Sequence, residues 1–169
     1  MPWSIDRDLV IAGKLRLAVQ RIGIDHWRAD ARLRSWGLAP LHREGDAILV
    51  SCATNEALWL GAWLEETGSP ASVHLRDPIG GGSARIVVPP DDQLTALENA
   101  SQGRQPLALA EAGAAGTGSG RTLALALEVE DCSARVDLVL LPPGEWSTRA
   151  RRTPAQGRNA PPPLPPRLG

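Results

Sequence analysis

Two cysteines and three histidines are the residues of this 169-residue chain best suited to chemistry. Cys52 ends an apolar run and precedes a predicted helix, whose N-terminal N–H groups would lower the pKa of a thiol. A nucleophilic cysteine also needs a base, and His26 and His74 are the candidates. No known nucleophile signature surrounds Cys52, however, and cysteine is among the most buried residue types. The pattern therefore favours a core cysteine over a catalytic one.

The same residue types do not have the spacing of a metal site. Structural zinc sites use pairs of ligands a few residues apart, whereas Cys52 and Cys132 are distant in sequence and no two histidines are close. The glycine-rich stretch 80–83 is followed by a predicted strand, although a phosphate-binding loop is followed by a helix. We therefore expect neither a metal nor a cofactor.

Tryptophan supplies every aromatic side chain, because the sequence has six tryptophans and no phenylalanine or tyrosine. Trp59 and Trp63 lie four residues apart in the segment 55–66, which is predicted to be a helix with almost no polar face. Such a helix is buried in a core or at an interface. Core packing is one interpretation. The alternatives are that the two tryptophans anchor a partner protein or a second copy of the chain, or bind carbohydrate or another small ligand.

The C-terminal run 161–167 is the most specific local motif. Pro162 and Pro165 have P-x-x-P spacing, and Arg167 follows two residues later. A polyproline II helix repeats every three residues, so the two prolines share a face. The motif resembles a ligand of SH3-like domains, whose aromatic grooves bind such a ridge and whose acidic patch meets a flanking arginine. The alternative is a semi-rigid, solvated spacer.

Charge divides the chain into an acidic body and a basic tail. Residues 1–145 carry 13 basic and 19 acidic residues, whereas residues 146–169 carry five arginines and no acidic residue. The tail also holds six prolines and has almost nothing to bury, so it is predicted to be disordered. We expect one globular domain over 1–145, with a mobile glycine- and alanine-rich loop at about 101–121, followed by the tail.

Hydrophobic periodicity predicts both helices and strands. The segment 8–22 fits a helix and a strand equally well, and its acidic first turn favours the helix. Further helices are expected over 25–36, 55–66 and 92–100, and strands over 47–52, 72–76 and 84–88. Residues 123–141 predict a β-hairpin with one buried face, formed by Leu123, Leu125, Leu127, Val136, Leu138 and Leu140. The expected fold class is α+β: a mainly antiparallel sheet of about five strands with two to four helices.

Composition excludes several classes of protein. The formal net charge of -1 and the isoelectric point of about 6.3 argue against a protein that coats nucleic acid, because such binding rests on a large positive charge. No apolar run reaches transmembrane length and no secretory leader is recognised, so we expect a cytoplasmic protein without a membrane span. A single lysine among 18 basic residues indicates GC-rich, bacterial coding.

These observations predict a non-enzymatic protein–protein interaction or assembly protein, a scaffold or adaptor whose body and tail contact different partners. The oppositely charged tail and the apolar segment 55–66 also suit a homo-oligomer. Two alternatives belong to other classes. One is a small cysteine-dependent enzyme that uses Cys52 with a histidine, and the other is a carbohydrate or small-ligand binding module that uses the tryptophans.

Overall fold

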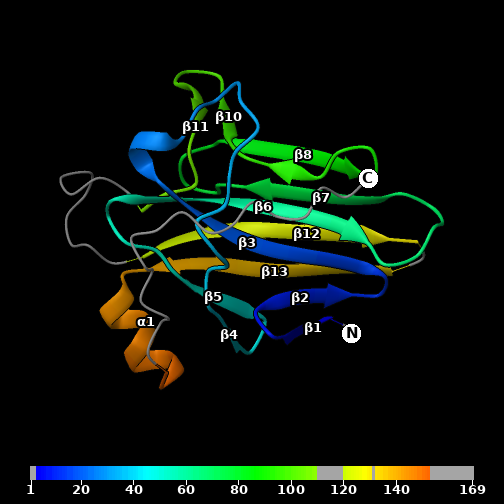
Figure 1. Cartoon of the computed structure of the whole chain (residues 1–169), viewed down its shortest axis with the longest axis horizontal. Helices are drawn as coiled ribbons and strands as arrows, with labels where there is room; N and C mark the ends of the chain where they lie inside the picture. Colours follow the sequence, from blue (N-terminus) through cyan, green and yellow to red (C-terminus); the bar gives the residue numbers. More distant parts are fainter. Residues whose placement is uncertain (1–2, 110–119, 131, 153–169) are drawn as a thin grey trace.

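The computed structural model describes residues 3–109, 120–130 and 132–152, and this part of the chain is mainly β-strand (Figure 1). A 3-10 turn, η1 (Ile24–His26), and one α-helix, α1 (Pro143–Ala150), are the helical elements of the described residues. The strands are β1 (Trp3–Asp6), β2 (Leu9–Ala12), β3 (Leu15–Gly23), β4 (Leu41–Glu44), β5 (Ala47–Ser51), β6 (Glu56–Leu64), β7 (Ala71–Arg76), β8 (Ser83–Val88), β9 (Gln93–Leu94), β10 (Leu97–Asn99), β11 (Gly103–Gln105), β12 (Arg121–Val129) and β13 (Cys132–Leu141).

The strands form two sheets that share one hydrophobic core. One sheet has five strands in the order β1-β2-β3-β6-β9, and the other has eight in the order β11-β10-β8-β7-β12-β13-β5-β4. Neighbouring strands are antiparallel except for β13 and β5, which are parallel. Leu17 and Leu60 from the first sheet lie in one buried cluster with Leu125 and Leu138 from the second. The fold is therefore a sandwich of two sheets, and the predicted α+β class is wrong.

The segment 55–66, predicted to be a helix, is strand β6, which pairs with β3 along its whole length. Its apolar residues fill both faces of the strand. Leu58 and Leu60 face the core between the sheets, whereas Ala57 and Trp59 face outward into a second buried cluster. A strand that is buried on both faces loses the alternation of apolar and polar residues, so periodicity does not separate it from a buried helix.

The segment 8–22 is also strand rather than helix. A turn at Gly13 divides it into two strands. Gly13 has a φ of 56°, in the left-handed region that favours glycine, and it joins β2 to β3. The turn before β2 is harder to foresee, since Arg7 and Asp8 both have positive φ without glycine or asparagine. The other two predicted helices are wrong as well. Residues 25–36 are irregular after η1, and residues 92–100 contain β9 and β10.

The remaining strand predictions are confirmed. The predicted strands 47–52, 72–76 and 84–88 correspond to β5, β7 and β8, and the hairpin 123–141 corresponds to β12 and β13 at the centre of the eight-stranded sheet. All six residues of the predicted buried face of the hairpin are at most 4% exposed. Strict alternation identified this hairpin because only one of its faces meets the core.

Helix α1 extends the ordered chain beyond the predicted boundary of the body. The buried indole of Trp146 donates a 2.9 Å hydrogen bond from Nε1 to the carbonyl oxygen of Leu49 on β5. Arg149 pairs with Glu44 next to β5, and Figure 1 shows α1 beside this edge of the sheet. No helix in the described part of the chain is long and apolar enough to cross a bilayer.

Two predicted segments lie partly or wholly outside the described residues. Within the predicted mobile loop 101–121, β11 pairs with β10, and Leu107 is buried and bridges to Leu58 on β6. Residues 110–119 of that loop are outside the described part. The same holds for residues 153–169 of the predicted tail, which include Pro162, Pro165 and Arg167.

Candidate functional site

The outer face of the five-stranded sheet is covered by residues 24–40, which we call the strap. The strap leaves the end of β3, reaches β9 and returns to β3 (Figure 1). At β9 the backbone of Leu33 exchanges two 3.1 Å hydrogen bonds with the side chain of Gln93. On its return, the strap pairs with β3 through the bridge between Gln20 and Leu38. Leu33 fills the space above the sheet together with Trp59.

The tryptophans of this face hold the strap in place. Trp27 donates from Nε1 to the carbonyl oxygen of Thr95 at 2.9 Å, and Trp59 donates to that of Arg34 at 3.1 Å. Trp59 is 6% exposed. Trp63 is half-buried and faces the same side of the sheet as Trp59, because positions four apart in a strand share a face. The indole N–H groups of Trp27 and Trp59, which a ligand platform would offer to a ligand, are therefore already hydrogen-bonded to backbone carbonyls.

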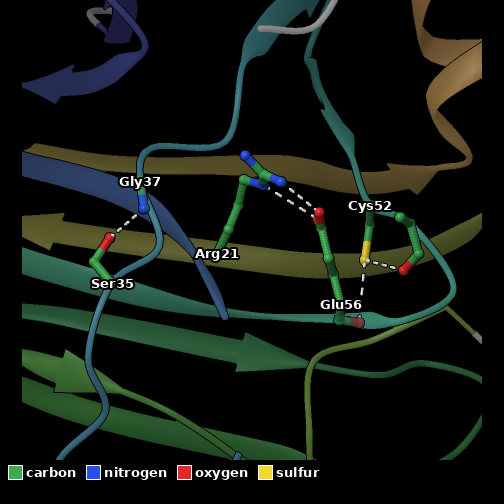
Figure 2. Close-up of polar contacts among 6 residues, drawn as sticks. Arg21, Ser35, Gly37, Cys52 and Glu56 are labelled. Atoms are coloured by element: carbon green, nitrogen blue, oxygen red, sulfur yellow. Dashed lines mark hydrogen bonds and ion pairs between the residues drawn. The ribbon is translucent and has the colours of Figure 1, made fainter. Parts of the chain in front are cut away.

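Cys52 lies just beyond β5, next to the ion pair of Arg21 and Glu56 (Figure 2). Its Sγ is 3.6 Å from the carbonyl oxygen of Ala53 and 3.8 Å from that of Glu56. Burial raises the pKa of the Cys52 thiol to about 12, against the opposing hydrogen bond with the backbone of Leu109. The thiol therefore stays protonated near neutral pH, and none of the groups that shift its pKa is a histidine.

The two candidate histidines lie on different elements, His26 in the turn η1 and His74 on β7. His26 is exposed and packs against Trp36, with 5.3 Å between the ring centroids. His74 is exposed on the outer side of β7 in the eight-stranded sheet. Cys52 is fully buried in the core cluster between the sheets. The structure therefore places these three residues in separate environments rather than in one site.

The outer face of the eight-stranded sheet carries exposed charged side chains that have no ion pair among the described residues. Helix α1 covers this face at β5, and we call the outward-facing residues of β8, β7, β12 and β13 the open face. Cross-strand pairing arranges them in rows. The first row contains Arg76, Ala124 and Asp137, and the second row contains Arg85, His74, Ala126 and Arg135.

A trough of about 460 Å³ lies along β12 on the open face. Its floor is formed by Ala124 and Ala126, and its walls stand on β7 and β13. The walls are two strand spacings apart, about 10 Å. Alanine is a poor strand residue because its methyl group makes little cross-strand contact. Two alanines at the centre of the sheet therefore give up stabilisation and leave a hollow. The side chains of the walls and of one end of the trough are His74, Arg76, Arg135, Asp137 and Asp46.

Three arginines of the open face have no carboxylate partner within the described part of the chain. None of the ion pairs found there involves Arg76, Arg85 or Arg135. By contrast, Arg32 of the strap pairs with Asp92 at 2.5 Å, and Arg104 pairs with Asp30 of the strap at 2.7 Å. Guanidinium groups in a planar fork are the side chains best suited to bind carboxylates from outside.

A second hollow of similar volume continues the open face toward the end of β12. It lies beside Arg85 and Glu128. Glu128 accepts a 3.2 Å hydrogen bond from Ser72, and Glu130 pairs with Lys14. The acidic groups at this end are therefore engaged. Arg76 and Arg135 line the trough over β12, whereas Arg85 lines the second hollow.

Sequence reasoning found His74 but missed the site around it. The signal was present in the alternation 123–128, where Leu123, Leu125 and Leu127 mark the buried face and Ala124 and Ala126 mark the outer one. Small residues at the outer positions of a central strand predict a hollow once their neighbours are known. The predicted hairpin gives one neighbour, β13, but the other neighbour, β7, depends on a strand order that the sequence did not reveal.

The described residues contain no group of three or more side chains that is arranged to hold a metal ion. Comparisons with models of protein families, with curated proteins and with solved structures found no match to this chain. The interpretation of the open face therefore rests on its geometry and charge.

Proposed function

We propose that this protein is a non-enzymatic interaction protein whose β-sandwich binds a segment of a partner protein in the trough over β12. The observation that carries the proposal is the open face itself: an alanine floor between walls of charged side chains whose arginines have no partner among the described residues. Concave sites with an apolar floor and a few convergent polar groups are typical of binding surfaces.

The scaffold or adaptor role rests on a second contact. The run 161–167 carries Pro162 and Pro165 at P-x-x-P spacing, with Arg167 behind them, and we assign it an SH3-like groove on a different partner. A chain with two separate contacts brings two proteins together, and linkage raises the effective concentration of one for the other.

The trough is tested by filling it. Random peptides of about 12 residues, displayed on phage, are selected on immobilised full-length protein, since a chain of this length spans the whole of β12. Ala126→Trp fills the floor, and Ala100→Trp adds the same side chain at an exposed position beyond β10. We expect the selected peptides to lose about tenfold or more in affinity for Ala126→Trp and none for Ala100→Trp.

Three further measurements keep this test decisive. Thermal unfolding shows whether Ala126→Trp is folded, and Ala124→Phe fills the same floor from the neighbouring row. Deletion of residues 153–169 should leave peptide binding unchanged, because the proposed second contact is separate. Selected peptides that bind all of these variants as tightly as wild type would contradict the proposal, and so would a selection that enriches none.

A further inference from the structure

We infer that the occupant of the trough is an extended acidic peptide, in which an apolar residue and an Asp or Glu stand two positions apart. This inference rests on the proposed function and specifies its partner. It follows from the spacing and the charge of the two rows of the open face.

The spacing of the rows matches that of an extended chain. Ala124 and Ala126 are two residues apart on β12, about 6.8 Å along the strand. Side chains at alternate positions of an extended peptide are separated by the same distance and point to the same side. A peptide that lies along the trough therefore places one side chain over each row.

The first row suits an apolar side chain. Arg76 and Asp137 stand on opposite sides of Ala124, so the two walls carry opposite charges, and Asp46 adds a second carboxylate at this end of the trough. The methyl group of Ala124 forms the floor between them, and Leu, Ile, Val or an aromatic ring fits over it at a width of about 10 Å.

The second row suits a carboxylate. Arg85, His74 and Arg135 lie on three strands along one line across the sheet, with Ala126 between the last two. The described carboxylates near this line are Asp46 and Asp137 at the first-row end of the trough, and Glu128, which is bonded to Ser72. An Asp or Glu over Ala126 therefore meets two wall groups that donate hydrogen bonds, and the guanidinium of Arg135 offers a planar fork to it.

The charge of the whole chain argues against a large polyanion as the partner. A protein with a formal net charge of -1 and a pI of about 6.3 does not attract polyanions by bulk charge. Its recognition of an acidic group must therefore come from a local arrangement such as the second row. A short acidic peptide needs only this row and the neighbouring floor.

The test is a change of specificity at one position. Arg135→Glu reverses the charge of one wall, and Arg34→Glu makes the same change at an exposed arginine of the strap whose side chain has no ion pair among the described residues. The phage selection is repeated on full-length wild type and on both variants. We expect wild type and Arg34→Glu to enrich an apolar residue with Asp or Glu two positions away, and Arg135→Glu to enrich Lys or Arg in place of the acid.

The outcomes separate this inference from the proposed function. Peptides that depend on the trough, as shown by Ala126→Trp, but have no acidic preference would overturn the inference and leave the proposed function standing. Trough-dependent peptides whose preference is the same on Arg135→Glu would overturn it as well. A single-stranded DNA of about 20 nucleotides is the control for phosphate. If it binds more tightly than the selected peptides and Arg135→Glu abolishes that binding, the partner is a nucleic acid and the peptide assignment is wrong.

Discussion

The outer face of the five-stranded sheet is closed by the strap, whereas the outer face of the eight-stranded sheet is left open over its central strands. On the closed face the outward positions carry Trp59 and Ile22, both buried under Leu33. On the open face the corresponding positions carry Ala124 and Ala126. Both faces belong to one sandwich, so the contrast lies in what each outer surface does rather than in how the core is built.

The two faces also differ in the partners of their polar side chains. The strap is tied down by side chains that are matched to partners within the described chain, such as the indole N–H of Trp59 with Arg34 and the guanidinium of Arg32 with Asp92. The arginines beside the trough have no such partner. Exposed ion pairs add little to stability, so this difference concerns availability for binding. It supports the proposal that the open face is a binding surface, whereas the residues beneath the strap serve the fold.

The largest effect is expected on the closed face. Trp59→Ala removes a buried indole and its hydrogen bond, and should lower the free energy of unfolding by about 3–5 kcal/mol. Trp63→Ala is the matched control, since Trp63 faces the same side of the sheet but is only half-buried, and its loss should be clearly smaller. Denaturant unfolding of both variants measures this. Equal losses at the two positions would mean that the strap does not protect Trp59.

The inner face of the open sheet should respond almost as strongly. Leu138→Ala empties a position that is 1% exposed in the core and should cost about 2–5 kcal/mol of unfolding free energy. If the same measurement gives a loss below about 1 kcal/mol, the register of β12 and β13 assigned here is wrong.

The end of β7 holds a contact that should depend on pH. Burial by itself would raise the pKa of Asp77, but the N–H groups of Gly80 and Ile79 and the guanidinium of Arg121 outweigh it and hold the pKa below its ordinary value. Because the folded protein binds this proton more weakly than the unfolded chain, Asp77 stabilises the fold above the unfolded pKa of about 3.9. That contribution is lost as the pH falls through the folded pKa.

Asp77→Asn should therefore destabilise the protein at neutral pH and not in acid. The expected loss at pH 7 is roughly 1–3 kcal/mol, because Arg121 loses its partner in a partly buried place. Unfolding curves of wild type and variant should converge as the pH falls through the lowered pKa of Asp77 in the folded protein. A constant difference across this range would mean that the carboxylate charge of Asp77 contributes nothing.

The smallest effect is expected on the open face. Arg135→Ala and Arg76→Ala should each change the free energy of unfolding by less than about 0.5 kcal/mol, because neither side chain has an ion pair among the described residues. The same denaturant titration checks them beside Trp59→Ala. A loss above about 1 kcal/mol at either arginine would show a structural role and would break the contrast between the two faces.

The sequence predicted the hairpin 123–141 and the short buried strand β5, but it failed for the long strand β6, which is buried on both faces. The hairpin 123–141 alternates over most of its length because its outer side is the open face; at the end of β13, α1 covers Val139 and Leu141. Strand β6 does not alternate because the strap buries its outer side, and the strap has no regular structure of its own beyond η1. Whether an irregular segment covers one face of a strand depends on the tertiary structure. Local periodicity therefore cannot indicate it.

The candidate site was predictable only in part, for a related reason. His74 stood out by residue type, and the burial of Cys52 followed from its apolar surroundings. The trough, however, depends on β12 lying between β7 and β13, and these strands are separated in sequence by more than 40 residues on one side. Alanines and arginines on three strands form a site only after the order and register of the strands are fixed.

The central claim is that recognition occurs on the open face and not on the closed one. The most direct measurement is the amide NMR spectrum of the full-length wild-type protein as the most enriched phage peptide is added. We predict shifts that are concentrated in β7, β12 and β13 around Ala126 and small in the strap. Shifts concentrated in the strap and in β3 and β6, with β12 unchanged, would contradict the account.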